Sequence, residues 1–111
     1  MLTRHLALLF VWLGALTLTA AGQDQTQLEH GRALVTRMCE SCHAIGASGD
    51  SPHPYAPPFH RLQRLLEFES FVDRLREGVM VAHPDMPTFR FNRQEAAAVA
   101  AYLTSIQPEQ R

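Results

Sequence analysis

Lysine is absent from this 111-residue sequence, so its positive side chains are arginines and its formal net charge is −1 with the histidines neutral. Basic residues form neither a run nor a stripe, which argues against nucleic-acid binding. The same absence removes any lysine surface that could guide a partner. The length allows one ordinary domain. We therefore expect a single small domain that binds no nucleic acid.

Cysteine is also scarce, with only Cys39 and Cys42 in the chain. A disulfide across so short a loop would stabilise a small domain weakly. A structural zinc site needs four ligands, typically from two such pairs, and only one pair is present. A thioredoxin-like dithiol would follow a strand in a βαβ unit, whereas this pair lies at helical spacing. These three interpretations are therefore disfavoured.

Residues 1–22 are predicted to be a secretory signal peptide. Arg4 and His5 precede the apolar run LALLFVWLGALTLTAA, which ends among small residues. A retained membrane anchor is the alternative, but the run is shorter than the ~20 residues that a spanning helix needs. We therefore expect residues 23–111 to form the exported domain, with no stable membrane insertion after cleavage.

The rest of the sequence predicts an all-α fold. Capping pairs are formed by Thr26 with Glu29 and by Asn92 with Glu95. Apolar or small side chains recur at helical spacing through residues 26–42, 59–68, 70–77 and 92–106. Proline and glycine between these segments predict loops, and no strand alternation is visible.

The segment RMCESCH at residues 37–43 places a histidine directly after the second cysteine. In C-x-x-C-H the two thiols can form thioethers with the vinyl groups of one haem, and the histidine can coordinate its iron. Such attachment takes place outside the cytoplasm in bacteria, which agrees with a signal peptide. The motif therefore predicts one covalent haem c, which would also supply part of the core of so short a chain.

Four segments, taken in order, resemble the small soluble class I cytochromes c. They are G-x-x-x-V-x-x-x-C-x-x-C-H at 31–43, APPF at 56–59, HPDMPTF at 83–89 and AYLTSI at 101–106. The resemblance implies a class I cytochrome c fold, with three to four helices around one haem and with the terminal helices crossing. Crossing contacts are expected between Gly31 and Val35 on the first helix and Val99 and Tyr102 on the last.

The resemblance also implies which residues bind the haem. Cys39 and Cys42 would carry it, and His43 and Met86 would be the proximal and distal iron ligands. The carbonyl of Pro57, or of Pro58 if the loop is shifted by one, would accept the Nδ1 hydrogen of the proximal histidine. A proline-flanked loop favours Met86 as a ligand over a core methionine. The other sixth ligands considered are Met80, His53, His60 and His83, together with Met38, which is too close to Cys39 to reach the opposite face of the haem.

Two features of the family are missing here. Trp12 lies in the predicted signal peptide, so the tryptophan that contacts a haem propionate in many members has no counterpart. Tyr55, Arg61 and Arg90 are the candidates to replace it. The lysine ring that guides mitochondrial members to their oxidase is also absent.

The resemblance implies a periplasmic electron carrier rather than an enzyme. A thioether ligand favours ferrous iron, so a His/Met pair raises the reduction potential relative to two histidines. Its partners would be redox proteins such as a dehydrogenase, a bc1-type complex or a terminal oxidase. The alternatives are an electron-accepting subunit of a periplasmic dehydrogenase and a ligand-binding haem protein with an open distal site.

Overall fold

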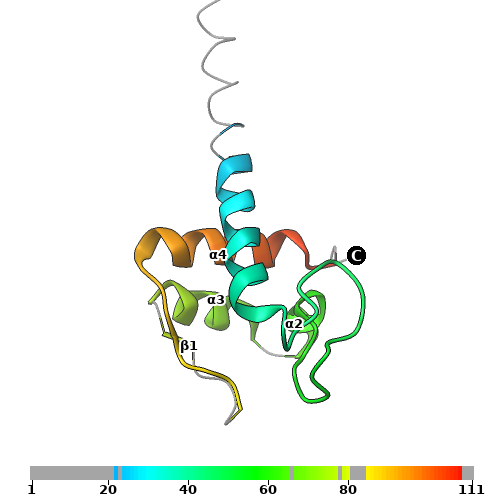
Figure 1. The fold of residues 1–111 in the computed structure, drawn as a ribbon. Coiled ribbons are helices and arrows are strands. Elements are labelled where there is room, and N and C mark those ends of the chain that lie inside the picture. The colour runs from blue at the N-terminus through cyan, green and yellow to red at the C-terminus, as the bar shows by residue number, and fades with distance from the viewer. Residues whose placement is uncertain (1–21, 23, 66, 78, 81–84, 109–111) are drawn as a thin grey trace, which may run out of the picture.

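The structure, a computed structural model, describes residues 22, 24–65, 67–77, 79–80 and 85–108. These residues are mostly helical, which confirms the all-α prediction. An N-terminal helix spans residues 24–39. It is followed by η1 (Phe59–Arg61), α2 (Leu62–Leu65), α3 (Phe68–Arg76), β1 (Val79–Met80), β2 (Phe89–Arg90) and α4 (Arg93–Ser105). The N-terminal helix crosses α4, and α3 lies along α4 (Figure 1).

The terminal helices cross at Gly31, as the resemblance implied. A Cβ built on Gly31 would overlap the carbonyl oxygen of Ala98 and lie 2.9 Å from Cβ of Tyr102. Val35 and Val99 are both buried in the core beside this crossing. A residue without a side chain is needed here, because the two helix backbones approach too closely for any larger one.

The sequence of α3 explains both its helical form and its position. Its buried side chains, Phe68, Phe71, Val72 and Leu75, recur at three- and four-residue spacing. These positions form one face of a helix, and polar residues occupy the other. That apolar face joins the core built with α4, the N-terminal helix and η1.

The start of α4 has the predicted capping box. The Asn92 side chain accepts from Glu95 N at 2.9 Å, and Asn92 N donates to Glu95 Oε2 at 3.0 Å. The predicted capping role of Thr26 is wrong. Its hydroxyl donates to the Gly22 carbonyl at 2.9 Å, the bond of a threonine within a helix, so the helix begins upstream of it.

Two short strands were not expected from the sequence. Val79 pairs with Arg90 and Met80 with Phe89 in antiparallel register. The pairing joins the two ends of the segment that carries Met86, and each strand is only two residues long, too short for an alternating pattern to reveal it. The other regular elements among the described residues are helices.

Within the part of the chain that the structure describes, no helix combines the length and the apolar character needed to cross a membrane. The predicted signal peptide lies outside the described residues, except for its last position, residue 22.

Candidate functional site

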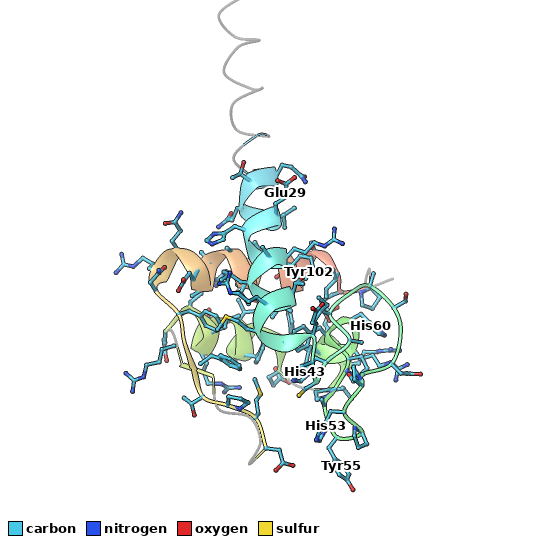
Figure 2. All side chains as sticks on the ribbon, viewed as in Figure 1. Glu29, His43, His53, Tyr55, His60 and Tyr102 are labelled. Atoms are coloured by element: carbon cyan, nitrogen blue, oxygen red, sulfur yellow. The ribbon has the colours of Figure 1, made fainter. Side chains whose placement is uncertain are left out.

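His43 is positioned by the end of the N-terminal helix. The helix stops at Cys39, whose carbonyl oxygen accepts from both Cys42 N at 3.1 Å and His43 N at 2.9 Å. This turn keeps both cysteines and the histidine within one compact segment. Figure 2 shows His43 below the helix, with His53 and Tyr55 farther along the loop that follows it.

The imidazole of His43 has a defined orientation. Its Nδ1 lies 2.8 Å from the carbonyl oxygen of Pro57, and its ring packs against Phe59 with 4.6 Å between ring centroids. A carbonyl oxygen can only accept, so Nδ1 carries the hydrogen and Nε2 keeps its lone pair. The ring is therefore oriented to bind a metal through Nε2. The sequence had left Pro57 and Pro58 as alternatives for the carbonyl that accepts from Nδ1, and in the structure it is Pro57.

The backbone around His43 is held by partners that are distant in sequence. Cys42 O accepts from His53 N at 3.1 Å, and Ala44 O accepts from Phe59 N at 2.9 Å. The Tyr102 hydroxyl on α4 donates to Ile45 O at 2.9 Å. The segment next to His43 is thus hydrogen-bonded both to the later part of its own loop and to α4.

A cavity of about 800 Å³ lies beside this segment. Its lining includes all five residues that the resemblance assigned to haem binding: Cys39, Cys42, His43, Pro57 and Met86. Most of its other walls are apolar, from Met38, Ala56, Phe59, Leu62, Leu65, Phe71, Pro87 and Phe89. The volume falls in the range of cofactor sites, which are concave, largely apolar and lined by a few polar groups.

Cys39 is poorly suited to thiolate chemistry. Both cysteines are free, and burial, with a smaller contribution from Cys42, raises the pKa of the Cys39 thiol to about 11. Nucleophilic dithiols and zinc ligands require thiolates, which a raised pKa disfavours. No cluster of three or more His, Cys, Asp or Glu suited to a metal ion occurs among the described residues.

The lining therefore fits haem better than a metal ion held by side chains alone. Two cysteine side chains lie on one segment with a histidine whose Nε2 is available, and a methionine lines the same apolar cavity. Nitrogen and thioether ligands of this kind hold haem iron in c-type sites. The cavity walls supply the apolar surroundings that a porphyrin requires.

Two of the alternative sixth ligands, His53 and His60, are less well placed than Met86. For two others, the side chain lies outside the described residues. His53 lines the cavity, but its Nδ1 already accepts from Tyr55 N at 3.2 Å. His60 is not among the lining residues, and its Nδ1 is buried without a hydrogen-bond partner. His83 and the side chain of Met80 lie outside the described residues.

The candidates for the missing tryptophan also differ in position. Tyr55 lines the cavity. Arg61, which pairs with Asp50 at 3.6 Å, and Arg90, on β2, are not among the lining residues. Arg74 of α3 lines the cavity and was missed by the sequence analysis. Its helical spacing of three from Phe71, another lining residue, was the available signal.

Comparisons with known proteins support haem binding by this chain. A family model described as "Cytochrome C oxidase, cbb3-type, subunit III" matches residues 26–103. Cytochrome c-552 of Bradyrhizobium diazoefficiens is 34% identical over 79 residues, which cover 71% of this chain and 74% of the relative. No solved structure gives a significant match.

The family match spans most of the chain and includes the complete C-x-x-C-H motif, Pro57 and Met86. Proteins of this kind are electron-transfer proteins with covalently bound haem. The chain therefore belongs to the cbb3-type cytochrome c oxidase subunit III family, as a small c-type cytochrome whose cofactor is covalently bound haem c.

Proposed function

We propose that this chain is an exported mono-haem electron carrier. Its haem is attached through Cys39 and Cys42, and its iron is held by His43 and Met86. The observation that carries the proposal is that these four side chains line one cavity of about 800 Å³. Bound there, haem c supplies a single electron as its iron changes between the ferric and ferrous states.

His43 is assigned the proximal position because its imidazole is already oriented. Pro57 O fixes the hydrogen on Nδ1, and the Phe59 ring restricts rotation of the imidazole plane. A donated hydrogen bond of this kind also raises the basicity of a ligating histidine. The ligand therefore needs little rearrangement when the oxidation state changes.

Met86 is assigned the distal position. It is half-buried, lines the cavity and lies on the segment closed by the β1–β2 pair. A thioether is a soft, neutral ligand that favours ferrous iron and so raises the reduction potential. A filled distal position also excludes a substrate from the iron, which separates a carrier from a ligand-binding protein.

Arg74 is assigned to balance the charge of the haem propionates. Among the described residues it is the arginine that lines the cavity, and Glu77 and Asp85 line the same cavity. Two propionates placed near those carboxylates would concentrate negative charge. The guanidinium offsets it and can bind a carboxylate through two parallel hydrogen bonds.

The cavity rim supports transient docking of a redox partner. Tyr55 and Leu65, with 76% and 60% of their surfaces exposed, both line the cavity. Exposed apolar side chains beside a redox centre suit the small interfaces of electron-transfer complexes. The partner classes are a dehydrogenase, a bc1-type complex or a terminal oxidase, and the family description supports the last of these.

Export to the periplasm is supported by the signal-peptide pattern of residues 1–22 and by the chemistry of haem c attachment, which takes place outside the bacterial cytoplasm. Mass spectrometry of protein recovered from the periplasm tests this part of the proposal. A mature chain beginning near residue 22 and carrying one haem is expected, whereas a full-length chain found in the membrane contradicts it.

The carrier function is tested by the visible spectrum of the chain exported from a host with haem-attachment machinery. We expect sharp reduced c-type bands and, in the ferric state, the weak far-red band of methionine-ligated haem. A Cys39→Ser/Cys42→Ser double variant controls for covalent attachment and should lose its haem in acidic organic solvent. A high-spin spectrum that shifts with carbon monoxide would instead show an open distal site.

A further inference from the structure

We propose that Gln107, at the end of α4, is a positioning residue for the His43 imidazole. The inference rests on the proposed function, in which His43 is the proximal iron ligand. Gln107 does not line the cavity, so it acts through the residues that orient the histidine.

The carboxamide of Gln107 joins three backbone groups. Its Nε2 donates to the carbonyl oxygens of Phe59 and Leu103, each at 2.8 Å, and its Oε1 accepts from Gln63 N at 3.0 Å. These groups belong to η1, α4 and α2 respectively. One half-buried side chain therefore ties the last helix to both short helices beside the cavity.

Only a carboxamide of this length satisfies all three groups. Two carbonyl oxygens require two N–H donors, and the Gln63 amide requires an acceptor, which matches the donors and acceptor of a glutamine amide. A carboxylate could accept from Gln63 but would face two carbonyl oxygens without a donor. The interaction is thus chemically specific and not only a matter of packing volume.

The tether reaches His43 through residues 57–59. Within that segment, Pro57 O accepts the Nδ1 hydrogen of His43 and the Phe59 ring packs on its imidazole. Phe59 is held at both of its backbone polar groups, because its N–H donates to Ala44 O at 2.9 Å and its carbonyl accepts from Gln107. Gln107 therefore anchors the segment that supplies both orienting contacts.

The tether also supports the cavity wall. The Phe59 carbonyl accepts from Leu62 N as well, and Gln63 N belongs to the first turn of α2, where an amide lacks a helical partner. Leu62 and Leu65 of the same helix line the cavity. Loss of the carboxamide would leave the Gln63 amide unpaired and allow residues 57–65 to open more often.

The test compares Gln107→Glu with Gln94→Glu in the haem-loaded, full-length protein. Gln94 is exposed on α4 and is not among the lining residues, so its change adds the same charge without breaking the tether. NMR of the ferrous protein measures solvent exchange of the His43 Nδ1 hydrogen. In the ferric protein the haem methyl shifts report the orientation of the axial ligands.

We expect Gln107→Glu to speed exchange of the His43 Nδ1 hydrogen on the order of tenfold, because the hydrogen bond to the Phe59 carbonyl is lost and a carboxylate faces that oxygen instead. The haem methyl shifts should change with it, and Gln94→Glu should leave both measurements as in the unmodified protein. Should Gln107→Glu accumulate without haem, Gln107→Met removes the hydrogen bonds to both Phe59 O and Gln63 N without adding a charge, since methionine is similar in shape.

A Gln107 variant that only unfolds more easily, with exchange and methyl shifts equal to those of the Gln94 control, would overturn the positioning role. The proposed function is tested separately by the unmodified protein. If the His43 ring lacks paramagnetically shifted resonances in the ferric state, His43 is not an iron ligand, whatever the variants show.

Discussion

Gly31 lies directly against the backbone of Ala98 where the N-terminal helix crosses α4. A side chain at Gly31 would overlap the Ala98 carbonyl oxygen, and Cβ of Tyr102 lies beside the same point. One turn of α4 farther on, the Tyr102 hydroxyl holds Ile45 O, two residues after His43. The close crossing therefore helps to hold the loop that follows His43 as well as the fold.

Gly31→Ala should lower the free energy of unfolding by about 1–3 kcal/mol, because overpacking at a backbone contact outweighs the better helix propensity of alanine. Chemical denaturation of the haem-loaded protein measures this change. Gly46→Ala is the matched control, since a Cβ there meets nothing within 4 Å, and its effect should stay within about 0.5 kcal/mol. Equal effects of the two substitutions would contradict the tight crossing.

If Met86 is the proposed distal ligand, Met86→Ala should abolish the far-red band of the ferric protein and lower its reduction potential, because a soft ligand that favours ferrous iron is lost. The variant should also bind carbon monoxide when reduced. Spectroscopy and potentiometry check both expectations. Met38→Ala and Met80→Ala provide the comparison, and loss of the band in either of them, with Met86→Ala unaffected, would assign the distal ligand elsewhere.

Arg74→Ala should lower the reduction potential by tens of millivolts, since a nearby cation disfavours the more positive ferric state. Solvent limits the size of the effect because Arg74 is exposed. Arg76→Ala is the control, because Arg76 pairs with Asp73 at 3.1 Å and does not line the cavity. Potential shifts of the same size in both variants would exclude a specific role for Arg74 at the propionates.

Electron self-exchange of the exported domain should depend weakly on salt, changing less than about threefold between ~10 mM and ~0.5 M. Residues 23–111 carry nine arginines against eleven acidic residues, a small formal net charge of −2 before the haem is counted, and the proposed docking rim carries Tyr55 and Leu65. NMR line broadening in mixtures of the oxidised and reduced protein measures this rate. Leu65→Lys should slow exchange at low salt by placing like charges face to face. Gln94→Lys should leave the exchange rate unchanged. If both variants slow exchange equally, docking does not take place at the rim formed by Tyr55 and Leu65.

Much of the fold could be predicted from local patterns. The capping box of Asn92 and Glu95 involves residues three apart, and the apolar face of α3 follows from helical spacing. The pattern failed at Thr26, because a threonine hydroxyl can also bond back to a carbonyl four residues earlier inside a helix. It failed again at β1 and β2, where two residues are too few to show a period.

For the site, the sequence could predict which residue types belong together but not every contact between them. It left Pro57 and Pro58 as alternatives for the carbonyl that accepts from His43. In the folded loop, Pro57 O lies 2.8 Å from Nδ1 of His43. It offered Tyr55, Arg61 and Arg90 as candidates for the propionate contact. Tyr55 lines the cavity, but the arginine that lines it among the described residues is Arg74. The direction of an exposed arginine depends on how its helix packs, which spacing alone does not determine.

The sequence by itself determined the haem chemistry and the family, because C-x-x-C-H brings two thiols and a histidine together through covalent spacing and one turn of backbone. Only the tertiary structure decided how that histidine is oriented. Phe59 meets Gln107 across 48 residues, and Ile45 meets Tyr102 across 57. Such contacts arise when packed helices bring distant backbone groups within hydrogen-bonding distance, and no local pattern contains that information.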